Sequence, residues 1–503
     1  MKPSKKTITL ADLRKHHIGH HPYPTDPDYL LIARNLQKII LKNVDTKPLG
    51  DDFAQTLAIN LTLHLEDTVA DAGLWRTFCT EHRRLYGRWL PFGWGDDDDM
   101  PLDEVTLGSC QFIIWMTLCD TKTCRSAHPM MPLITALAAH TFAYLDTVFC
   151  DVPINDDLLD DIYPDEDDFI QDRTILEWLA IDSYLSDWYV TRDTLEEHRD
   201  TLTEAFEDIS SDQATYGARA MSAFGSKVGP LALLPQEWYA AMLRTNPEKD
   251  CKQRADTIAA IQHAPFGAYI IENTDEKFIN VQDFDGQHYA IQRFSFGPTL
   301  ALQNLSHVNT FAGMMARYKG EWQANGMSTF LNSAADFEQE KKLYRQAQKL
   351  IRNNAKIINK YVDSRHGQRL YYFDNIPAIT RWLKEDVQFE DVETLAEGFH
   401  DDLKQADTIV IYLAKDGSMP FTTNNADALK DPQNPFYDPQ HGRDYGPYNL
   451  ETNLFSGECI RYMLDRGIFA DAAFNSPLSP QLNHTLFQQN IDFLARFTRR
   501  ARY

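Results

Sequence analysis

Four polar side chains at helical spacing are the first candidates for chemistry in this sequence. His64, Asp67 and Asp71 stand at i, i+3 and i+7, with Glu66 beside them, so a helix would place the three on one face. A histidine among carboxylates can hold a divalent ion or act as an acid–base pair. A solvated or capped polar face is the simpler interpretation, because no second acidic helix is evident that would complete a bundle site.

Histidines crowd a second segment, HHIGHHPYP, which contributes His16, His17, His20 and His21. Imidazole is the commonest metal ligand among side chains, so the cluster invites a metal interpretation. A glycine and two prolines interrupt the segment, however, and no regular spacing places the four rings around one ion. We therefore predict no metal here.

The remaining metal candidates lack a ligand pattern. Cys119 and Cys124 form one close pair without the second pair that a structural zinc site needs. The acidic segments 96–104 and 155–168 lack the alternating oxygen ligands, central glycine and closing glutamate of an EF-hand loop. The sequence predicts no bound metal and no cofactor.

The motifs of the commonest enzyme classes are also absent. The sequence contains no Walker-type phosphate loop, no Rossmann fingerprint, no G-x-S-x-G elbow and no H-E-x-x-H helix. The absence of these motifs does not exclude an active site assembled from residues far apart in the sequence. One candidate for it is the segment 424–444, rich in Asn, Asp, Pro and Gly, which we expect to be a long loop.

Helical patterns surround these residues on both sides. Apolar residues at i, i+4 and i+8 begin at Phe53, and buried helices are expected at 112–118, 131–149 and 173–189. Later in the chain, a long amphipathic helix is expected from about 337 to 361, with Ser333 and Asp336 as a weak capping box. A short β-rich pair at 408–413 and 419–422 follows, and the segments 451–466 and 480–500 close the chain as helices.

The stretch 267–330 is the only one in which several β-type runs follow one another. Runs at 269–271, 278–281, 289–291, 311–318 and 322–330 are separated by turn residues, including Asp285-Gly286. Five strands in this length predict a small closed antiparallel barrel of SH3-like or OB-like type, with its Asp285-Gly286 hairpin exposed. The fold class is therefore mainly α with an inserted small antiparallel β-barrel (α+β).

Four parts follow from these patterns. We expect an N-terminal arm (1–49), a helical domain (50–262), the small barrel (263–332) and an α+β C-terminal region (333–503).

Charge and composition limit the partners. The formal net charge is −24, which repels phosphate backbones, and the barrel has aromatics but no basic stripe for single-stranded nucleic acid. Arg317, Lys319 and Trp322 form the one candidate contact patch, so a protein partner is expected and nucleic acid is not. The seven sparse cysteines and the lack of a secretory or membrane-spanning run predict a cytoplasmic protein.

Several motifs together resemble an uncharacterised bacterial family, a domain of unknown function. They are Glu66-Asp67, Trp75, Tyr86-Gly87 and Leu90-Pro91-Phe92, in this order. The opening HHPYPTDPDYLLIARNL, the segment RTILEWLAIDSYL, the central β-rich pattern and NPFYDP also fit, so the resemblance runs over most of the chain. It implies no activity and carries over no functional residue.

Two hypotheses from different classes remain. The first is a binding or adaptor protein that presents the small barrel to a protein partner. The alternative is a divalent-metal-dependent hydrolase or nuclease-like enzyme that uses the His64, Glu66, Asp67 and Asp71 face or the 424–444 loop. A pocket where those two regions meet would favour the enzyme.

Overall fold

A computed structural model describes residues 7–50, 52–95, 100–122, 125, 127–166, 168–206, 209–246, 251–297, 307–389, 392, 401–451, 454–475 and 480–503. The chain divides into two compact units, which are described separately. The first comprises Met1–Asp283 and His288–Asn332, and the second Phe284–Gln287 and Ser333–Tyr503.

The first unit begins with helices packed around a central one. The helices are α1 (Leu10–Arg14), α2 (Asp26–Asn43), α3 (Phe53–Ala70), α4 (Leu74–Tyr86), α5 (Leu107–Cys119), α6 (Pro132–Val148), α7 (Asp156–Ile162), α8 (Phe169–Glu177), α9 (Tyr189–Ala205), α10 (Ser211–Gly225), α11 (Pro235–Thr245) and α12 (Lys252–Ala259), with short turns η1 (Ile18–His20), η2 (Lys47–Leu49), η3 (Pro91–Gly93) and η4 (Trp178–Asp182).

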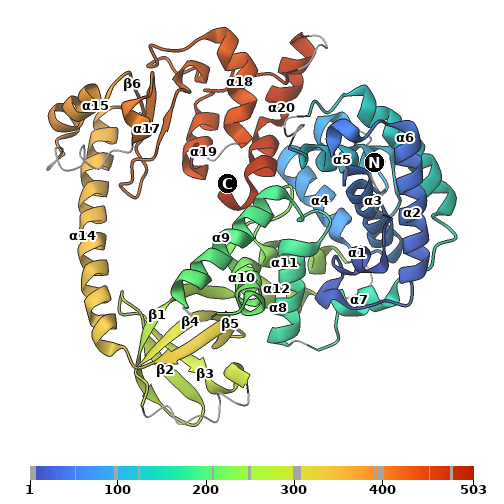
Figure 1. Cartoon of the computed structure of the whole chain (residues 1–503), viewed down its shortest axis with the longest axis horizontal. Helices are drawn as coiled ribbons and strands as arrows, with labels where there is room; N and C mark the ends of the chain where they lie inside the picture. Colours follow the sequence, from blue (N-terminus) through green and yellow to red (C-terminus); the bar gives the residue numbers. More distant parts are fainter. Residues whose placement is uncertain are drawn as a thin grey trace, which may run out of the picture. The chain divides into compact units, whose positions relative to one another are not determined.

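Helix α3 is the central one. It packs against α2, α4 and α5 (Figure 1), and its side chains are buried on nearly every face. A helix that is apolar on most faces is stable only when neighbours cover it from several sides. Two of these neighbours were predicted, but α2 was not, because the preceding histidine- and proline-rich segment reads as an irregular arm.

The helix predicted at 173–189 is interrupted, and this prediction is wrong in its middle. Helix α8 ends in the π-turn η4, where the Ser183 N–H donates to the carbonyl of Trp178 at 2.9 Å. The backbone is then extended at Ser183 and at Trp188, and α9 begins at Tyr189. A π-turn inserts one residue into the helical repeat and often lies at a functional site. The interruption places Asp182 and Asp187 outside regular helix.

The barrel prediction is confirmed, with one correction. Strands β1 (Gln262–Thr274), β2 (Phe278–Gln282), β3 (His288–Gln292), β4 (Thr310–Tyr318) and β5 (Glu321–Leu331) close in the order β1-β2-β3-β5-β4. The closing pair β3–β5 is parallel, with Ile291 opposite Trp322, so the barrel is mixed and not antiparallel. Geometry requires this, because strands around a closed ring can alternate in direction only when their number is even.

The β2–β3 hairpin turns at Asp285-Gly286 as expected, and Asp285 is exposed. Pairing ends at Gln282 and His288, however, and Gly286 (φ +88°) has positive φ while Asp285 does not, so the connection is the loop 283–287 and not a two-residue turn. Inside the barrel, Tyr269, Ile279 and Phe311 belong to its buried core. Helix α10 packs against β1 and β5, and Asn325 of β5 donates a hydrogen bond to the carbonyl of Ala220 at 3.1 Å. The barrel and the helices of the first unit are thus joined by packing and by a buried hydrogen bond.

The second unit begins with the predicted long helix. It contains α14 (Ala334–Ser364), α15 (Ile376–Trp382), α17 (Asp401–Lys404), α18 (Pro439–Glu451), α19 (Gly457–Asp465) and α20 (Pro480–Arg499), turns η6 (Leu383–Val387), η7 (Ala426–Ala428) and η8 (Arg500–Arg502), and a sheet ordered β6 (Leu370–Phe373), β7 (Ile409–Tyr412), β8 (Phe421–Thr423).

Two local expectations fail in this unit. Ser333 precedes α14 but makes no side-chain cap, so the predicted capping box is absent. The expected long loop is helical from Pro439 onward, although α18 contains Pro447. Strand β6 was not predicted, because four residues are too few to establish a period.

Among the described helices, none has both the length and the apolarity that crossing a bilayer requires.

Candidate functional site

A polar cavity of about 490 Å³ in the first unit is the strongest candidate for a functional site. Small-molecule pockets typically have volumes of about 300–1,000 Å³. Segments far apart in the sequence contribute its lining, which consists of Asp12, Lys15, His16, His20, Asp52, Gln55, Thr56, Ile59, Asn60, Asp120, Ile181, Asp182, Asp187 and Arg192.

His16 is held as a neutral hydrogen-bond acceptor at this cavity. Its Nδ1 lies 2.7 Å from the carbonyl oxygen of Asp182, so Nδ1 carries the proton and donates it. Burial lowers the pKa of His16, although the charge of Asp187 opposes the shift. The lone pair is then on Nε2, and no described residue donates a hydrogen bond to it.

His20 reaches the cavity through a tight turn. Gly19 and His20 both have left-handed backbone, with φ of 60° and 59°. A Cβ at Gly19 would meet only the exposed side chain of His21, which can move, so the positive φ is what favours glycine at this position. The turn brings Nε2 of His20 to 3.4 Å from Asp182. Strained backbone of this kind often occurs at functional sites.

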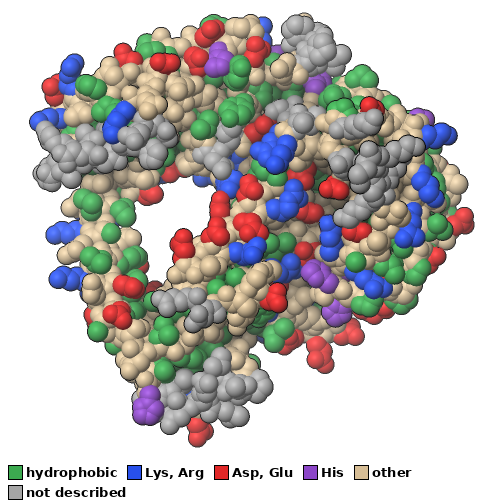
Figure 2. Space-filling view, in the orientation of Figure 1, with side chains coloured by type: hydrophobic (Ala, Val, Ile, Leu, Met, Phe, Trp, Pro, Cys, Tyr) green, Lys and Arg blue, Asp and Glu red, His purple; other side chains and the backbone are tan. Residues whose placement is uncertain are grey.

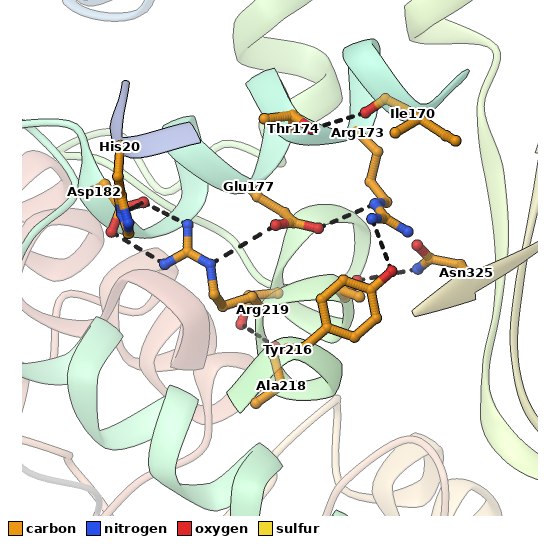
Figure 3. A network of polar contacts seen from close by, with 12 residues as sticks. His20, Ile170, Arg173, Thr174, Glu177, Asp182, Tyr216, Ala218, Arg219 and Asn325 are labelled. Atoms are coloured by element: carbon orange, nitrogen blue, oxygen red, sulfur yellow. Dashed lines mark hydrogen bonds and ion pairs between the residues drawn. The ribbon is translucent and has the colours of Figure 1, made fainter. Parts of the chain in front are cut away.

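Asp182 starts a chain of alternating charges that leads away from the cavity. Figure 3 shows Arg219 between Asp182 and Glu177, and Arg173 between Glu177 and Tyr216. Arg219 donates to both oxygens of Asp182, at 3.2 and 2.5 Å. Burial alone would raise the pKa of Asp182, but hydrogen bonds from His20 and Arg219 lower it below its ordinary value. Asp182 is therefore ionised and oriented.

A second ion-pair cluster lies on the cavity wall. Arg192 donates to both oxygens of Asp120, at 2.9 and 2.7 Å, and to Asp187 at 2.6 Å. The N–H of Tyr189 also donates to Asp120 at 2.8 Å, which ties the start of α9 to the end of α5. Burial raises the pKa of Asp120, and the charge of Arg192 opposes the shift.

Two amide side chains of α3 complete the wall. Asn60 is 6% exposed and donates to the hydroxyl of Thr117 at 3.0 Å. Gln55 is 8% exposed, and its amide makes no hydrogen bond with any described residue; its Oε1 is buried without a partner. A buried polar group without a partner costs about 1–3 kcal/mol. Gln55 Oε1 is thus an acceptor in the cavity wall whose hydrogen-bonding capacity is unused by the described residues.

The arrangement favours recognition of hydrogen-bond donors. His16 Nε2 is an acceptor, and among the described lining residues five are aspartates and two, Lys15 and Arg192, are cations. Arg192 is already engaged by Asp120 and Asp187, whereas Asp52 makes no side-chain contact among the described residues. Among the described lining residues, the charged groups without a described partner are thus Asp52 and Lys15, and the unused neutral acceptors are His16 Nε2 and the Gln55 amide oxygen.

The polar face predicted on α3 lies elsewhere, in the buried interior. His64, Glu66 and Asp67 are each at most 5% exposed. Asp67 accepts from the N–H groups of Leu74 and Trp75 at 3.0 and 2.7 Å, so it caps the start of α4. At Asp67 the structure therefore agrees with the simpler interpretation of the sequence, in which these polar residues cap a helix.

The neighbouring groups satisfy each other as well. His64 Nε2 lies 2.9 Å from the hydroxyl of Ser109, and Asn155 donates to Glu66 at 2.7 Å. Burial lowers the pKa of His64 to about 3 and raises that of Glu66 to about 7. Asp71 is the exception: it ends α3 in left-handed conformation and pairs with Arg76.

The 424–444 segment makes its own internal bonds. Asn434 donates to the carbonyls of Ala426 and Leu429, and His441 pairs with Asp427 at 2.5 Å. This segment belongs to the second unit and the α3 face to the first.

The predicted contact patch lies in the barrel of the first unit. Arg317 and Lys319 are exposed and line an open depression of about 870 Å³, together with Lys252 and Asp256 of α12. Trp322 is half-buried and packs edge-on against Tyr289, with ring centroids 4.9 Å apart. The patch thus has two exposed cations and one partly covered aromatic ring.

Across the described residues, no three histidine, cysteine, aspartate or glutamate side chains are grouped so as to hold a metal ion. His17 turns away from His16, with Nδ1 3.0 Å from the carbonyl of His21 and 3.7 Å from Asp26. Cys124 and part of the acidic segment 96–104 lie outside the described residues. In the segment 155–168, Asn155 and Asp168 cap α7 and α8.

Sequence reasoning noticed His16 and His20 but missed their partners. Asp182 follows His16 by 166 residues, and Gln55 looks like any polar residue on a helix. The sequence signal nearest to these partners is the pair Asp182 and Asp187, close to the end of the helix predicted at 173–189. Without a known fold, nothing linked that segment to the histidines.

The fold is mainly helical, with an inserted closed five-stranded barrel. The chain belongs to a family described as protein of unknown function (DUF3843), whose model matches residues 13–264 and 300–500. This confirms the resemblance inferred from the motifs, although the match leaves out 265–299, where β2, β3 and most of β1 lie. No curated protein and no solved structure matches the chain.

Proposed function

We propose that the first unit binds a small cation rich in N–H donors, such as a guanidinium or an amine, in the cavity at His16 and Gln55. The observation that carries this proposal is Gln55, a buried side chain of the cavity wall whose Oε1 is buried without a partner among the described residues. His16 lines the same cavity, and its Nε2 accepts no hydrogen bond from a described residue. Native proteins rarely leave such groups unpaired, and a ligand is a common reason for the exceptions.

The charge of the wall supports a cationic ligand. Five lining aspartates face two lining cations, and Arg219 adds one positive charge behind Asp182. A guanidinium group donates in a planar fork that suits carboxylates, and its remaining N–H groups can meet neutral acceptors. An anion would meet net repulsion at the same wall.

The test uses agmatine, which carries a guanidinium and an amine, in calorimetric titrations of the full chain. Gln55→Met removes the amide while keeping the side-chain length, and we expect agmatine to bind at least about tenfold more weakly, since one hydrogen bond to a charged group is worth about 1.5–3 kcal/mol. Stability should not fall, because the variant also removes a buried unpartnered oxygen.

Gln236→Met is the matched control. Gln236 is 6% exposed, its Oε1 is also buried without a partner, and it does not line the cavity. Its amide also donates to the carbonyl of Phe224 at 3.4 Å, so the variant removes one hydrogen bond together with the unpartnered oxygen. It should bind agmatine normally. Absence of agmatine binding, or equal weakening by both variants, would overturn the proposal, and preferential binding of sorbitol or inorganic phosphate would overturn the cationic assignment.

As a second candidate, we infer that the barrel docks an acidic segment of a partner protein at Arg317, Lys319 and Trp322. The observation that favours it is the open depression in which Lys252 joins Arg317 and Lys319. Among its described lining residues Asp256 alone is acidic, and it already pairs with Arg244 at 3.0 Å. In the view of Figure 2, basic side chains of the first unit stand among acidic ones without a continuous basic area, which disfavours nucleic acid.

Arg317→Ala with Lys319→Ala should weaken binding of an octaglutamate peptide by about tenfold without changing stability, because both side chains are exposed. Trp322→Ala should weaken it too, with a modest loss of barrel packing against Tyr289. Lys277→Ala, on an exposed barrel lysine outside the depression, is the control. Salt-sensitive, sub-micromolar binding of DNA or RNA in mobility shifts would contradict this candidate.

A further inference from the structure

The second unit contains a pocket of a different character. It has a volume of about 400 Å³ and lies between α14, the α15–η6 segment and the β7–β8 hairpin. Ile379, Leu383 and Ile411 form its buried apolar wall, and each is also part of the core of this unit. The wall is thus rigid and lacks hydrogen-bonding groups.

Apolar side chains also stand at the opening. Ile351 of α14 is 43% exposed and Phe421 of β8 is 42% exposed, and both line the pocket. Figure 2 shows apolar side chains along α14. Leu343 and Leu350 of this helix are more than half exposed. Single exposed apolar residues are normal, but two that border one apolar cavity extend its surface outward.

A glycine fixes the hairpin that forms one side of the pocket. Gly417 has φ +91°, and a Cβ there would lie 2.5 Å from the backbone nitrogen of Ala355 and 2.9 Å from the carbonyl oxygen of Ile351. The hairpin therefore lies directly on the backbone of α14. This close approach places Asp416 and Ser418 at the edge of the pocket.

The edge carries one oriented negative charge. Asp416 Oδ1 accepts from the N–H of Ser418 at 2.8 Å and from its hydroxyl at 2.7 Å. These hydrogen bonds lower the pKa of Asp416, so it is ionised at neutral pH. Its Oδ2 accepts no hydrogen bond from another described residue, and the side-chain amide of Asn354, also at the edge, has no described partner.

We propose that this pocket binds an apolar molecule with a cationic amine head, whose body contacts Ile379, Leu383 and Ile411 and whose head meets Asp416. The apolar wall offers no hydrogen bond to a second polar end group such as the guanidinium of agmatine. The carboxylate at the edge favours an amine over an alcohol of the same shape and repels a carboxylate. This site is independent of the cavity in the first unit.

Three probes of one shape test the proposal in calorimetric titrations: 4-phenylbutylamine, 4-phenylbutanol and 4-phenylbutyrate. The amine should bind with one-to-one stoichiometry, about tenfold more tightly than the alcohol, and the carboxylate should bind more weakly than the alcohol. Asp416→Asn should remove the preference for the amine and leave the affinity for the alcohol unchanged. Asp465→Asn, on an exposed aspartate of α19 outside the pocket, should change nothing.

A second pair of variants tests the apolar part. Ile351→Gln should weaken all three probes, whereas Leu343→Gln, on the same helix but outside the pocket, should weaken none. Both side chains are exposed, so neither change should unfold the unit. Gln55→Met should leave 4-phenylbutylamine binding unaffected, which separates this site from the first. The proposal would be overturned if 4-phenylbutylamine did not bind, or if its affinity were unchanged in Ile351→Gln or in Asp416→Asn.

Discussion

At the scale of single residues, burial sets the protonation state of the groups on α3. Glu66 is 3% exposed, and burial raises its pKa from 4.5 to about 7. Its folded pKa thus exceeds its unfolded one. The folded state keeps this proton between pH 4.5 and 7 while the unfolded chain loses it, so the contribution of Glu66 to stability is complete below pH 4.5 and declines as the pH rises through 7.

Glu66→Gln should therefore stabilise the protein at pH 8 relative to wild type, by on the order of 3 kcal/mol, and much less at pH 5. Glutamine cannot ionise, and its Oε1 can still accept from Asn155, which donates to Glu66 at 2.7 Å. Urea unfolding at the two pH values measures the difference, with Glu204→Gln on the exposed face of α9 as control. If the variant changed the free energy of unfolding equally at both pH values, the pKa of Glu66 would not be raised in the folded state.

The contribution of His64 to stability changes with pH in the opposite direction to that of Glu66. Burial lowers its pKa from 6.5 to about 3, so its folded pKa lies below the unfolded one, and stability is lost as the pH falls from 6.5 toward 3. Burial also raises the pKa of Asp67 to about 6. Glu66 and Asp67 therefore contribute less to stability as the pH rises toward 7, whereas His64 contributes less as the pH falls below 6.5.

At the scale of elements, the close approach of the β7–β8 hairpin to α14 depends on Gly417. Gly417→Ala should loosen this contact, because its Cβ would lie 2.5 Å from the backbone of Ala355. Amide hydrogen exchange in 409–423 should become faster. Gly467→Ala is the control, since Gly467 also has positive φ (+65°) but a Cβ there would meet nothing within 4 Å. If both variants accelerate amide exchange equally, the positive φ of glycine and not its close approach to α14 determines the stability of the hairpin.

Elements with a clear period could be predicted from the sequence, and irregular ones could not. The five strands and the long helix α14 follow from alternation and from apolar spacing. The interruption after η4 was not predicted, because Trp178, Tyr184 and Trp188 are apolar and would be buried in a continuous helix as well. Their side chains therefore give no sign of where the helix ends. The parallel pair β3–β5 follows only from closure of the ring, which is a property of the whole barrel.

At the scale of the whole molecule, the candidate site is assembled from parts that no local pattern connects. The histidine cluster was visible in the sequence, but the site needs Asp182 and Gln55, which reach it only through the packing of α3 and η4. The four histidines are irregularly spaced, which is why no metal was predicted at them. That same irregular turn, at Gly19 and His20, is what carries His20 to Asp182.

A crystal structure of the full chain with agmatine tests the central claim most directly. We expect the guanidinium group within hydrogen-bond distance of His16 Nε2 and of the Gln55 amide, with His16 still donating from Nδ1 to the carbonyl of Asp182. Agmatine bound elsewhere while this cavity stays empty, or an ordered water satisfying Gln55 with agmatine present in excess, would contradict the account.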